Sequence, residues 1–547
     1  MSALLAVVLA AASADAGVDP VFTALDLELN RAKTLSLMES PQAKAPTSPY
    51  HLLAFVGETT TFYANASFGA LTARGQDTSL SVNSHVRVGS PALDNTNFLD
   101  SGGFGGRRST PAELDPEVLR QALWLSFDFN FKDALETLAR KKAFLQTNAV
   151  SDRPIDFSEA PMASVLEPRA SLEVDRDAMT SLVKKASAVF LDYPQVFDGS
   201  ARANSTAWTQ WMVSSDPGRH RFAENRTELA LAVSTQASDG MNLRLWKRWG
   251  GTSPRDLPSE AEAIAVAKQL GERLTELAKQ PVAEEDYTGP VLFTGQAASM
   301  FFLQTVGEPL SEPREPLGSR QEGRLVDRLG KRVAVKFLTV KDDPTRRSFG
   351  PKGKETALWG YYPVDDDGVA PQPITLIDQG VLKTYFMNRA PTRKVEKSNG
   401  HARGSRPATG SMFVEGTSGT LSDKDLEKKL LAMLKDEDLE YGIIVEQTEE
   451  FPGRASGNEG TPLATPLLIW KVFPNGKRVP VRGLSFKPVS NRILKELVAL
   501  GNQPQVLNLE VRRQRTSVVS PSVLVRVMEL TRSRRDFEKP PVLARPQ

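Results

Sequence analysis

The chain has 547 residues, of which 40% are hydrophobic and 24% are charged, and its formal net charge is +2. This length and composition are typical of a globular protein with two or more domains, and the small net charge argues against a nucleic-acid partner held by general electrostatics. The sequence contains no cysteine, which excludes disulfides, thiolate metal sites and cysteine nucleophiles.

Met1–Ala16 has the pattern of a secretory signal peptide. An apolar run from Leu4 to Ala12 is followed by the small residues Ala14 and Ala16, which suit cleavage near either alanine. No lysine or arginine precedes the run, so an ordinary N-terminal helix is the alternative. We predict export to the periplasm or the extracellular space, with a cytoplasmic location as the alternative. The run is too short to cross a bilayer and no later segment is long and apolar enough, so we expect no stable membrane insertion.

Helix and strand patterns alternate in the N-terminal half. Asp19 is predicted to cap a helix that starts at Pro20, and two more helices are predicted over Pro116–Gln146 and Asp175–Phe190. Strands are predicted at Tyr50–Phe55, Thr60–Ala64, Phe68–Ala73, Leu80–Val88, Ala207–Ser214, Thr227–Thr235 and Met241–Trp249. This order of elements predicts a mixed α/β domain with an antiparallel sheet, that is, an α+β fold.

Two polar features of this half are assigned no function. His85 lies on the polar side of the strand Leu80–Val88, so we predict a lone surface histidine on a solvated face. Ser101–Gly106 is rich in glycine, but no Lys-Ser or Lys-Thr pair follows it and no strand leads into a helix there. We therefore predict a turn and not a phosphate-binding loop.

The boundary between two domains is predicted near Gln280–Asp286. A capping box of Ser259 and Glu262 starts a helix, and its apolar periodicity ends at this boundary. We expect an N-terminal domain over residues 17–283 and a C-terminal domain over residues 284–547. Strand patterns dominate the second part, which predicts an antiparallel, β-rich domain with a few helices.

The segment 287–308 is predicted to be a strand that leads into a helix. Val291–Phe293 is an apolar strand, and the helix is predicted over Gln296–Val306. The sequence, YTGPVLFTGQAASMFFLQTVGE, resembles the TldD/PmbA family of metallopeptidases, in which a similar lead-in precedes a helix with the motif H-E-x-x-x-H. The resemblance extends from about Thr288 to the end of the chain, whereas the N-terminal half matches only in the order of its elements.

The residues that this motif implies for metal binding and catalysis are replaced here. Alignment on the lead-in puts Leu303 at the first histidine, Gln304 at the glutamate and Glu308 at the second histidine. Leucine cannot donate a lone pair to zinc, and glutamine cannot take a proton from zinc-bound water. The family's further ligand is a cysteine, and the corresponding region, Tyr441–Glu449, offers glutamates instead. The resemblance therefore implies no catalytic residue and no metal site in this chain, with zinc only in an active partner.

Three more segments resemble the family in the same order: Asp365–Gly368, Ile374–Phe386 and Ser398–Gly404. Within the second, Gly380 predicts a hairpin turn because glycine readily adopts a positive φ. The third lies in a basic loop, Arg393–Arg406, for which an ordinary solvated loop is the alternative. From the resemblance we predict the following substrate-binding residues: Asn399, Gly400, His401 and Arg403.

Three functions remain open at this point. The first is a non-catalytic, TldE-type subunit that holds peptide or unfolded polypeptide for a TldD-like active subunit, or that forms a homodimer. The second is an active peptidase with an unrecognised site, built on Glu308 with His401 and an acidic residue. The third is a stand-alone exported peptide-binding protein. No nucleic-acid partner is expected in any of them.

Overall fold

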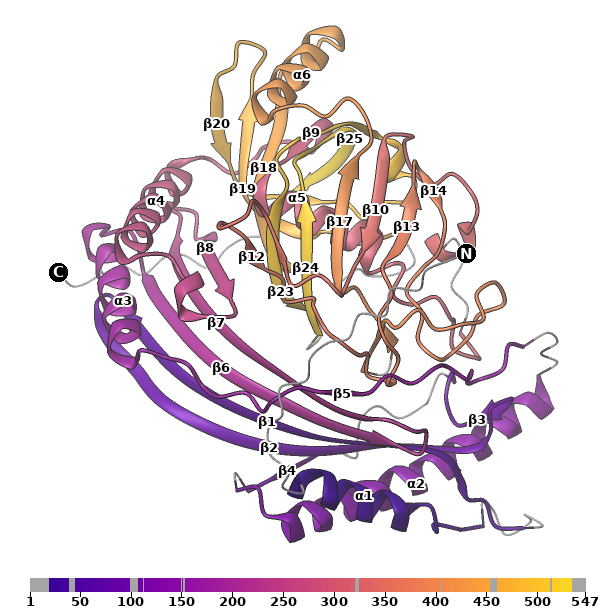
Figure 1. Cartoon of the computed structure of the whole chain (residues 1–547). Helices are drawn as coiled ribbons and strands as arrows, with labels where there is room; N and C mark the ends of the chain where they lie inside the picture. The colour runs from indigo at the N-terminus through magenta and orange to yellow at the C-terminus, as the bar shows by residue number, and fades with distance from the viewer. Residues whose placement is uncertain are drawn as a thin grey trace, which may run out of the picture.

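The computed structural model describes residues 19–38, 45–98, 107–111, 113–148, 150, 153–319, 324–404, 406–452, 460–511 and 514–533. The predicted leader, Met1–Ala16, and the predicted turn, Ser101–Gly106, lie outside these residues, so export and that turn stay predictions. Two bodies of β-structure, one from each half of the chain, pack against each other (Figure 1). The α+β class predicted from the sequence is confirmed.

A long curved sheet forms the N-terminal half (Figure 1). Its described strands run in the order β3-β2-β1-β6-β7-β5, with β4 beside β2 and β8 beside β7. All neighbours are antiparallel except β5, which pairs in parallel with β7. The bounds are β1 Pro49–Ser67, β2 Ala70–Ser90, β3 Leu93–Asp94, β4 Arg108–Thr110, β5 Val165–Leu166, β6 Asp198–Ser214, β7 Arg219–Gln236 and β8 Asn242–Gly251.

The strands of this sheet are longer than the sequence predicted. Tyr50–Phe55 and Thr60–Ala64 were expected as separate strands, but both belong to β1. The apolar alternation lapses between them, at Gly57 and Glu58. β1 nevertheless pairs with β2 on one side and with β6 on the other, and both registers continue through these residues. Tertiary pairing, which a local pattern does not record, therefore extends the strand.

Helices cover the convex face of the curved sheet: α1 Pro20–Ala32, α2 Pro116–Thr147, α3 Arg176–Ala188 and α4 Glu260–Lys279. α1 and α2 share a core with Leu52 and Val56 of β1, whereas α3 and α4 share one with Phe62 and Ala64 farther along the strand. All four residues are even-numbered, and successive side chains of a strand point to opposite faces. The odd-numbered residues of β1 therefore face the concave side, toward the C-terminal half.

The predicted starts of these helices are confirmed. The Asp19 side chain accepts a hydrogen bond from the N–H of Val21 at 2.9 Å, and Pro20 occupies the first helical position. Ser259 and Glu262 form both hydrogen bonds of the predicted capping box. Such caps satisfy N–H groups that have no partner within the helix, which is why the local sequence is sufficient to locate them.

The C-terminal half contains two larger sheets that enclose helix α5 Gly295–Phe302 in one hydrophobic core. One sheet has the order β20-β19-β18-β9-β25-β21, with β22 beside β25, and the other has the order β14-β13-β10-β17-β24-β23. The first comprises β9 Tyr287–Phe293, β18 Gly442–Pro452, β19 Ala464–Val472, β20 Arg478–Val481, β21 Leu484–Phe486, β22 Leu497–Leu500 and β25 Val523–Arg532. The second comprises β10 Leu338–Asp342, β13 Ile374–Asp378, β14 Val381–Leu382, β17 Ser411–Gly416, β23 Gln505–Val511 and β24 Gln514–Ser520.

Most neighbouring strands of these sheets are antiparallel, as predicted, but β9 pairs with β18 and β17 pairs with β24 in parallel. The predicted hairpin is confirmed, since Gln379 and Gly380, with φ of 46° and 80°, join β13 to β14. The remaining short elements are α6 Asp423–Asp436, the pairs β11 Ser348–Phe349 with β12 Thr356–Ala357 and β15 Ala402–Arg403 with β16 Arg406–Pro407, and 3-10 turns at Val189–Asp192, Pro254–Asp256, Leu325–Arg328 and Ile493–Lys495.

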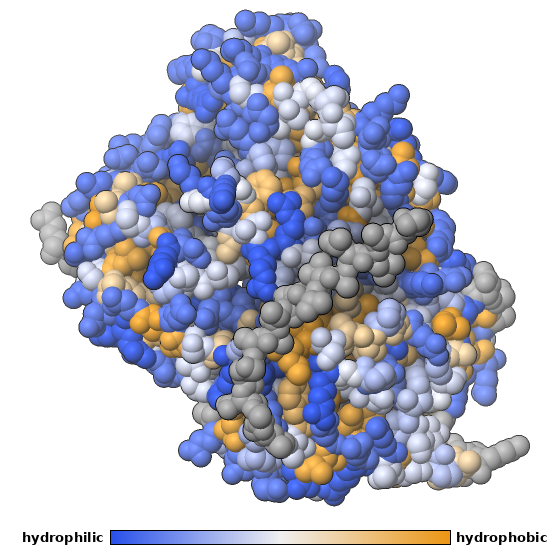
Figure 2. Space-filling model, viewed as in Figure 1, coloured by the Kyte–Doolittle hydropathy of each residue, from blue (hydrophilic) through white to orange (hydrophobic). Residues whose placement is uncertain are grey.

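The C-terminal half lies on the concave face of the curved sheet (Figure 1). Ion pairs connect the two halves, among them Arg515 of β24 with Glu224 of β7, and Arg248 of β8 with Glu450 of β18. Hydrophilic residues dominate the face of the molecule in Figure 2, with smaller apolar patches between them. Among the described residues, no helix combines the length and the hydropathy that a membrane span requires.

Candidate functional site

A π-helical turn follows α5 at the position of the family motif. α5 ends at Phe302, and residues Leu303–Gly307 continue as a π-helix. The N–H of Glu308 donates to the carbonyl oxygen of Leu303 at 2.8 Å, a bond that spans five residues. This bond brings positions 303 and 308 close together on one turn. Single π-helical turns within helices occur frequently at functional sites.

The side chains on this turn are packed into the protein. Leu303 is 2% exposed and Gln304 is 1% exposed, and Leu303 belongs to the core of the C-terminal half. Oε1 of Gln304 accepts a hydrogen bond from the N–H of Ala464 at 2.9 Å. Its Nε2 is buried and has no hydrogen-bond partner among the described residues. This amide therefore presents only N–H groups to its remaining surroundings, and N–H groups do not bind a cation.

Two of the four predicted substrate-binding residues have buried side chains with structural roles. The Asn399 amide donates to the carbonyl oxygen of Tyr385 and accepts from the N–H of Met387, both at 2.9 Å. His401 is 0% exposed, and its Nε2 lies 3.2 Å from Oδ1 of the buried Asp342. Its Nδ1 lies 3.0 Å from the Asn399 carbonyl oxygen. Both side chains are thus engaged with neighbouring protein groups.

Gly400 is required by the backbone at its position. Its φ is +74°, and a β-carbon there would lie 2.4 Å from the carbonyl oxygen of Ala370. Arg403 differs from the other three because its side chain lines a cavity. Of the four predicted residues, the structure therefore places Arg403 alone in a position to contact a ligand in that cavity.

This first cavity, of about 180 Å³, lies between the concave face of the N-terminal sheet and the C-terminal half. β6 and β7 contribute Trp208, Gln210, Met212, His220 and Phe222, and the C-terminal half contributes Tyr362, Val364, Asp365, Asp366, Arg403, Gln514 and Arg515. Segments far apart in the sequence thus meet around one space.

Two arginines lie over aromatic rings at the wall of the first cavity. The Arg403 guanidinium is 4.4 Å from the centroid of the Tyr362 ring, and that of Arg515 is 4.4 Å from the Trp208 ring. Burial lowers the pKa of Arg515 to about 10 against the opposing effect of Glu224, so Arg515 remains a cation at neutral pH. Nε of Arg403 is buried without a hydrogen-bond partner among the described residues. This N–H is available to an acceptor on a ligand.

His220 adds a neutral polar group to the same cavity. The residue is 3% exposed, and burial lowers its pKa to about 4, so the imidazole carries no charge at pH 7. Its Nδ1 has no hydrogen-bond partner among the residues that the structure describes. A neutral imidazole nitrogen either donates or accepts, depending on the tautomer.

The turn at Asp365–Gly368 shapes this wall. Asp365 is 1% exposed, and its carboxylate accepts from the N–H groups of Val369 at 2.8 Å and Ala402 at 3.0 Å. A β-carbon at Gly368, where φ is +83°, would lie 2.3 Å from Cε of Met162. Asp365 therefore fixes the turn, and Gly368 permits its close contact with Met162, in the segment that connects α2 to α3.

The prediction of a solvated His85 is wrong. Its ring lies 5.4 Å from the Phe55 ring on the concave face, and burial lowers its pKa to about 4. The predicted alternation is correct, since Val82 and Val86 are buried on the opposite face. The polar side faces the C-terminal half instead of solvent, because helices α1–α4 cover one face of the sheet and the C-terminal half covers the other.

Comparison with known proteins agrees with the resemblance seen in the sequence. Residues 286–532 match the profile described as the PmbA/TldA metallopeptidase C-terminal domain. The C-terminal half of the chain therefore carries a domain of the TldD/PmbA family. Its N-terminal sheet, outside the matched range, provides one wall of the first cavity.

Curated metalloproteases match only part of the chain. A metalloprotease of Archaeoglobus fulgidus is 33% identical over 79 residues, which cover 14% of this chain and 16% of the relative. A metalloprotease of Methanocaldococcus jannaschii is 28% identical over 117 residues, covering 21% and 23%. A third, from Methanothermobacter thermautotrophicus, is 25% identical over 182 residues and aligns over 36% of its own length. The chain thus spans about a third or less of the length of these relatives.

Solved structures share the fold over most of the chain. TldE from Thermococcus kodakarensis superposes with a TM-score of 0.59 at 10% identity, covering 93% of this chain and 100% of that one. A Thermotoga maritima protein solved as a candidate modulator of DNA gyrase has a TM-score of 0.59 at 16% identity, covering 88% and 96%. At these identities the likeness shows the fold.

The zinc site implied by the TldD/PmbA family does not fit the residues present. Leu303 offers no ligand atom, and the Gln304 oxygen is already bound to the N–H of Ala464. Among the described residues, no group of three or more histidine, aspartate or glutamate side chains is arranged to hold a metal ion. Zinc sites in proteins use three or four such donors.

The sequence reasoning missed the contribution of the N-terminal half to the first cavity. Trp208, Gln210 and Met212 occur at every second position of β6, and this spacing puts them on one face of the strand. The same strand buries Trp211 on its other face. Large apolar residues at both odd and even positions indicate a strand covered on both sides, and this signal could have been used.

Proposed function

We propose that this chain is a non-catalytic, TldE-like subunit that binds peptide or unfolded polypeptide for a TldD-like partner. In this proposal the partner supplies the zinc and the general base. The observation that carries it is the packed turn at Leu303–Gly307, where Leu303 is in the core and the Gln304 oxygen is bound to the backbone. Between Leu303 and Gly307 no side chain can take a proton from zinc-bound water, and the single carboxylate of Glu308 falls short of the three or four donors of a zinc site.

The first cavity is the proposed site for peptide. The rings of Trp208, Phe222 and Tyr362 offer apolar surface. His220 Nδ1 and Arg403 Nε offer polar contacts, because neither has a partner among the described residues. The described wall combines these apolar surfaces with seven polar or charged residues, among them Gln210, Asp366 and Gln514. This mixture suits a peptide, whose backbone carries N–H donors and C=O acceptors beside its side chains.

The fold of the Thermococcus kodakarensis neighbour, which is named TldE, is consistent with this role. The shared α+β fold covers 93% of this chain. From this shared fold we expect the chain to assemble with a second family member. Co-purification of the two proteins tests this expectation.

The test is peptide hydrolysis by the chain alone and after co-expression with a family member that carries an intact H-E-x-x-x-H motif. We expect no hydrolysis by the chain alone and hydrolysis by the co-purified pair. We also expect Arg403→Gln in this chain to lower the affinity of the pair for peptide by about tenfold, which corresponds to one lost charged hydrogen bond.

The matched control is Arg526→Gln, which changes an exposed arginine on β25. It should leave peptide affinity unchanged. Hydrolysis by the lone chain, or a pair whose activity does not respond to this subunit, would contradict the proposal.

A further inference from the structure

A second cavity, of about 400 Å³, lies where the segment after α2 meets the C-terminal half. It shares no lining residue with the first cavity. Its described lining comprises Asn97, Val150, Arg153, Pro154, Pro313, Arg314, Glu315, Leu317, Arg324, Val326, Asp327, Tyr385, Thr392, Arg393 and Lys394. The volume lies within the range of sites that hold small molecules.

The lining of this second cavity is strongly basic. Among its described lining residues, four arginines and one lysine stand against one glutamate and one aspartate. This excess of three positive charges is larger than the net charge of +2 carried by the whole chain. Like charges gathered around a partly enclosed space produce a positive potential that attracts anions.

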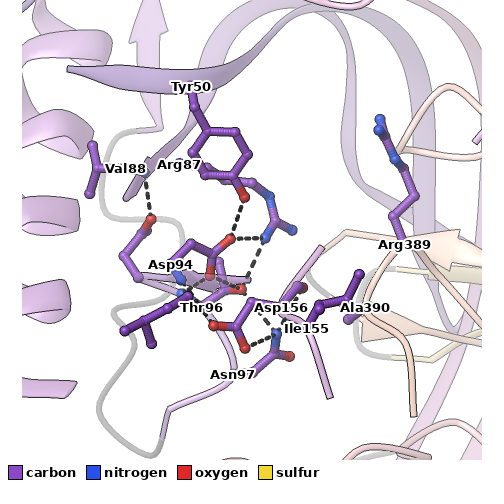
Figure 3. Close-up of polar contacts among 12 residues, drawn as sticks. Tyr50, Arg87, Val88, Asp94, Thr96, Asn97, Ile155, Asp156, Arg389 and Ala390 are labelled. Atoms are coloured by element: carbon purple, nitrogen blue, oxygen red, sulfur yellow. Dashed lines mark hydrogen bonds and ion pairs between the residues drawn. The ribbon is translucent and has the colours of Figure 1, made fainter. Parts of the chain in front are cut away.

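The buried side of the cavity wall does not neutralise this charge. The carboxylate of Asp156, which is 0% exposed, forms ion pairs with three side chains. Its oxygens lie 2.6 Å from the Lys141 nitrogen, 2.8 Å from an Arg153 nitrogen and 2.7 Å from an Arg314 nitrogen. The neighbouring Asp94 is paired with Arg87 at 2.7 Å, and Figure 3 shows both carboxylates within one polar network. Three cations therefore converge on a single carboxylate, and two of them line the cavity.

The pKa shifts of Arg314 and Lys141 also show that the single carboxylate of Asp156 does not fully compensate for the burial of these cations. Burial lowers the pKa of Arg314 and of Lys141, although Asp156 opposes the shift in each case. An anion in the cavity would offset the cost of holding these cations in one place.

Donor groups are also present along the wall. Arg393 and Lys394 are exposed on their loop, and Tyr385 and Thr392 share a hydrogen bond of 2.6 Å next to them. Nε of Arg324 is buried without a hydrogen-bond partner among the described residues. Guanidinium and ammonium groups are the side chains that recognise carboxylate and phosphate groups best.

We propose that the second cavity binds a small multivalent anion, whose charge is carried by phosphate or carboxylate groups. Arg393 and Lys394 contact the anion at the open side of the cavity. Arg314 and Arg324, deeper in the wall, contribute to the positive electrostatic potential that attracts it. Arg153 and Pro154, from the segment between α2 and α3, line the same cavity. A bound anion therefore also stabilises the contact of this segment with the C-terminal half. This inference is independent of the peptide site.

The experiment is calorimetric titration of the full chain with pyrophosphate in one arm and citrate in the other, at ionic strengths of about 0.05 M and about 0.5 M. We expect binding in at least one arm, weakened at the higher ionic strength. The arm with the tighter binding identifies phosphate or carboxylate as the preferred group.

The decisive variant is the double substitution Arg393→Gln with Lys394→Gln, at two exposed positions. We expect it to weaken binding by about tenfold or more. The control, Lys352→Gln with Lys354→Gln, removes two exposed lysines from a different loop and should leave binding unchanged. Equal affinity in the two double variants, or no binding of either anion, overturns the proposal. Equal unfolding temperatures of both variants and the parent chain verify that the comparison concerns binding.

Discussion

At the residue scale, Gln304 is the main reason why we expect this chain not to hydrolyse peptides. In the resemblance it stands where active relatives have a glutamate, and here its oxygen is committed to the N–H of Ala464. The residue is 1% exposed, so a charge at this position would be buried. Whether the fold tolerates a carboxylate at position 304 therefore depends on whether a cation lies beside it.

This dependence predicts the behaviour of Gln304→Glu. Without a nearby cation, the buried carboxylate should destabilise the fold by about 2–4 kcal/mol at pH 8. Burial raises the pKa of such a carboxyl in the folded state, so the penalty should shrink as the pH falls toward 5. Denaturant unfolding at both pH values measures this change, with Gln296→Glu, at a half-buried position on the first turn of α5, as the milder control. A variant restored to full stability by zinc would show that a metal site exists after all.

His220 predicts a pH effect of its own. Burial lowers its pKa from 6.5 to about 4, so between these values the unfolded chain binds a proton that the folded chain does not. The stability that the neutral imidazole contributes is therefore complete above pH 6.5 and is lost as the pH falls toward 4. In His220→Gln, the loss of stability between pH 7 and pH 4.5 should be smaller than in the parent chain. Identical losses in both proteins, measured by urea unfolding, would refute this assignment.

At the scale of elements, the sequence predicted local features well and pairing poorly. The caps at Asp19 and Ser259 were located correctly because each depends on a few neighbouring residues. β1 was predicted as two strands because the residues between them lack apolar alternation. Its continuity depends on hydrogen bonding to β2 and β6, which the local sequence pattern does not show. The π-helical turn at Leu303–Gly307 was predicted as ordinary helix, since no local rule distinguishes the two.

The π-helical turn predicts a steric requirement at Gly307. A β-carbon there would lie 2.9 Å from Oγ1 of Thr409 and 3.0 Å from Cδ1 of Leu303. Gly307→Ala should therefore destabilise the fold by about 1–3 kcal/mol, because both contacts lie in a packed region. The control is Gly57→Ala, where the nearest atom would be 3.4 Å away, an ordinary contact. Denaturant midpoints for the two variants should differ clearly, and equal midpoints would mean that the turn adapts without cost.

At the scale of the whole molecule, the first cavity could not be predicted because the two halves of the chain build it together. The sequence identified Arg403 on the C-terminal side of the first cavity, but Trp208 and His220 come from a sheet that resembles the family only in element order. The same arrangement explains His85, whose polar strand face is covered by the other domain. Burial of these residues follows from domain packing, which alternation within a single strand does not report.

The ion pair between Arg515 and Glu224 predicts how the halves depend on each other. Both side chains are largely buried, at 13% and 12% exposure. Arg515→Met should destabilise the chain by about 1–3 kcal/mol, because it leaves the buried Glu224 with only the longer ion pair to Arg226, at 3.8 Å. The double variant Arg515→Met with Glu224→Gln should recover part of that loss. The exposed pair of Lys487 and Glu529 is the control, and its removal should change the stability much less, because solvent screens exposed charges. Additive effects in the buried pair would contradict this account of the interface.

The central claim is that this chain holds no zinc of its own. The most direct measurement is the zinc content of the purified full chain, determined by mass spectrometry after expression in zinc-supplemented medium, alone and co-purified with a relative that carries H-E-x-x-x-H. The account predicts no stoichiometric zinc in the chain alone and about one zinc per pair in the complex, bound by the relative. One zinc per molecule in the lone chain, retained after dialysis, would contradict it.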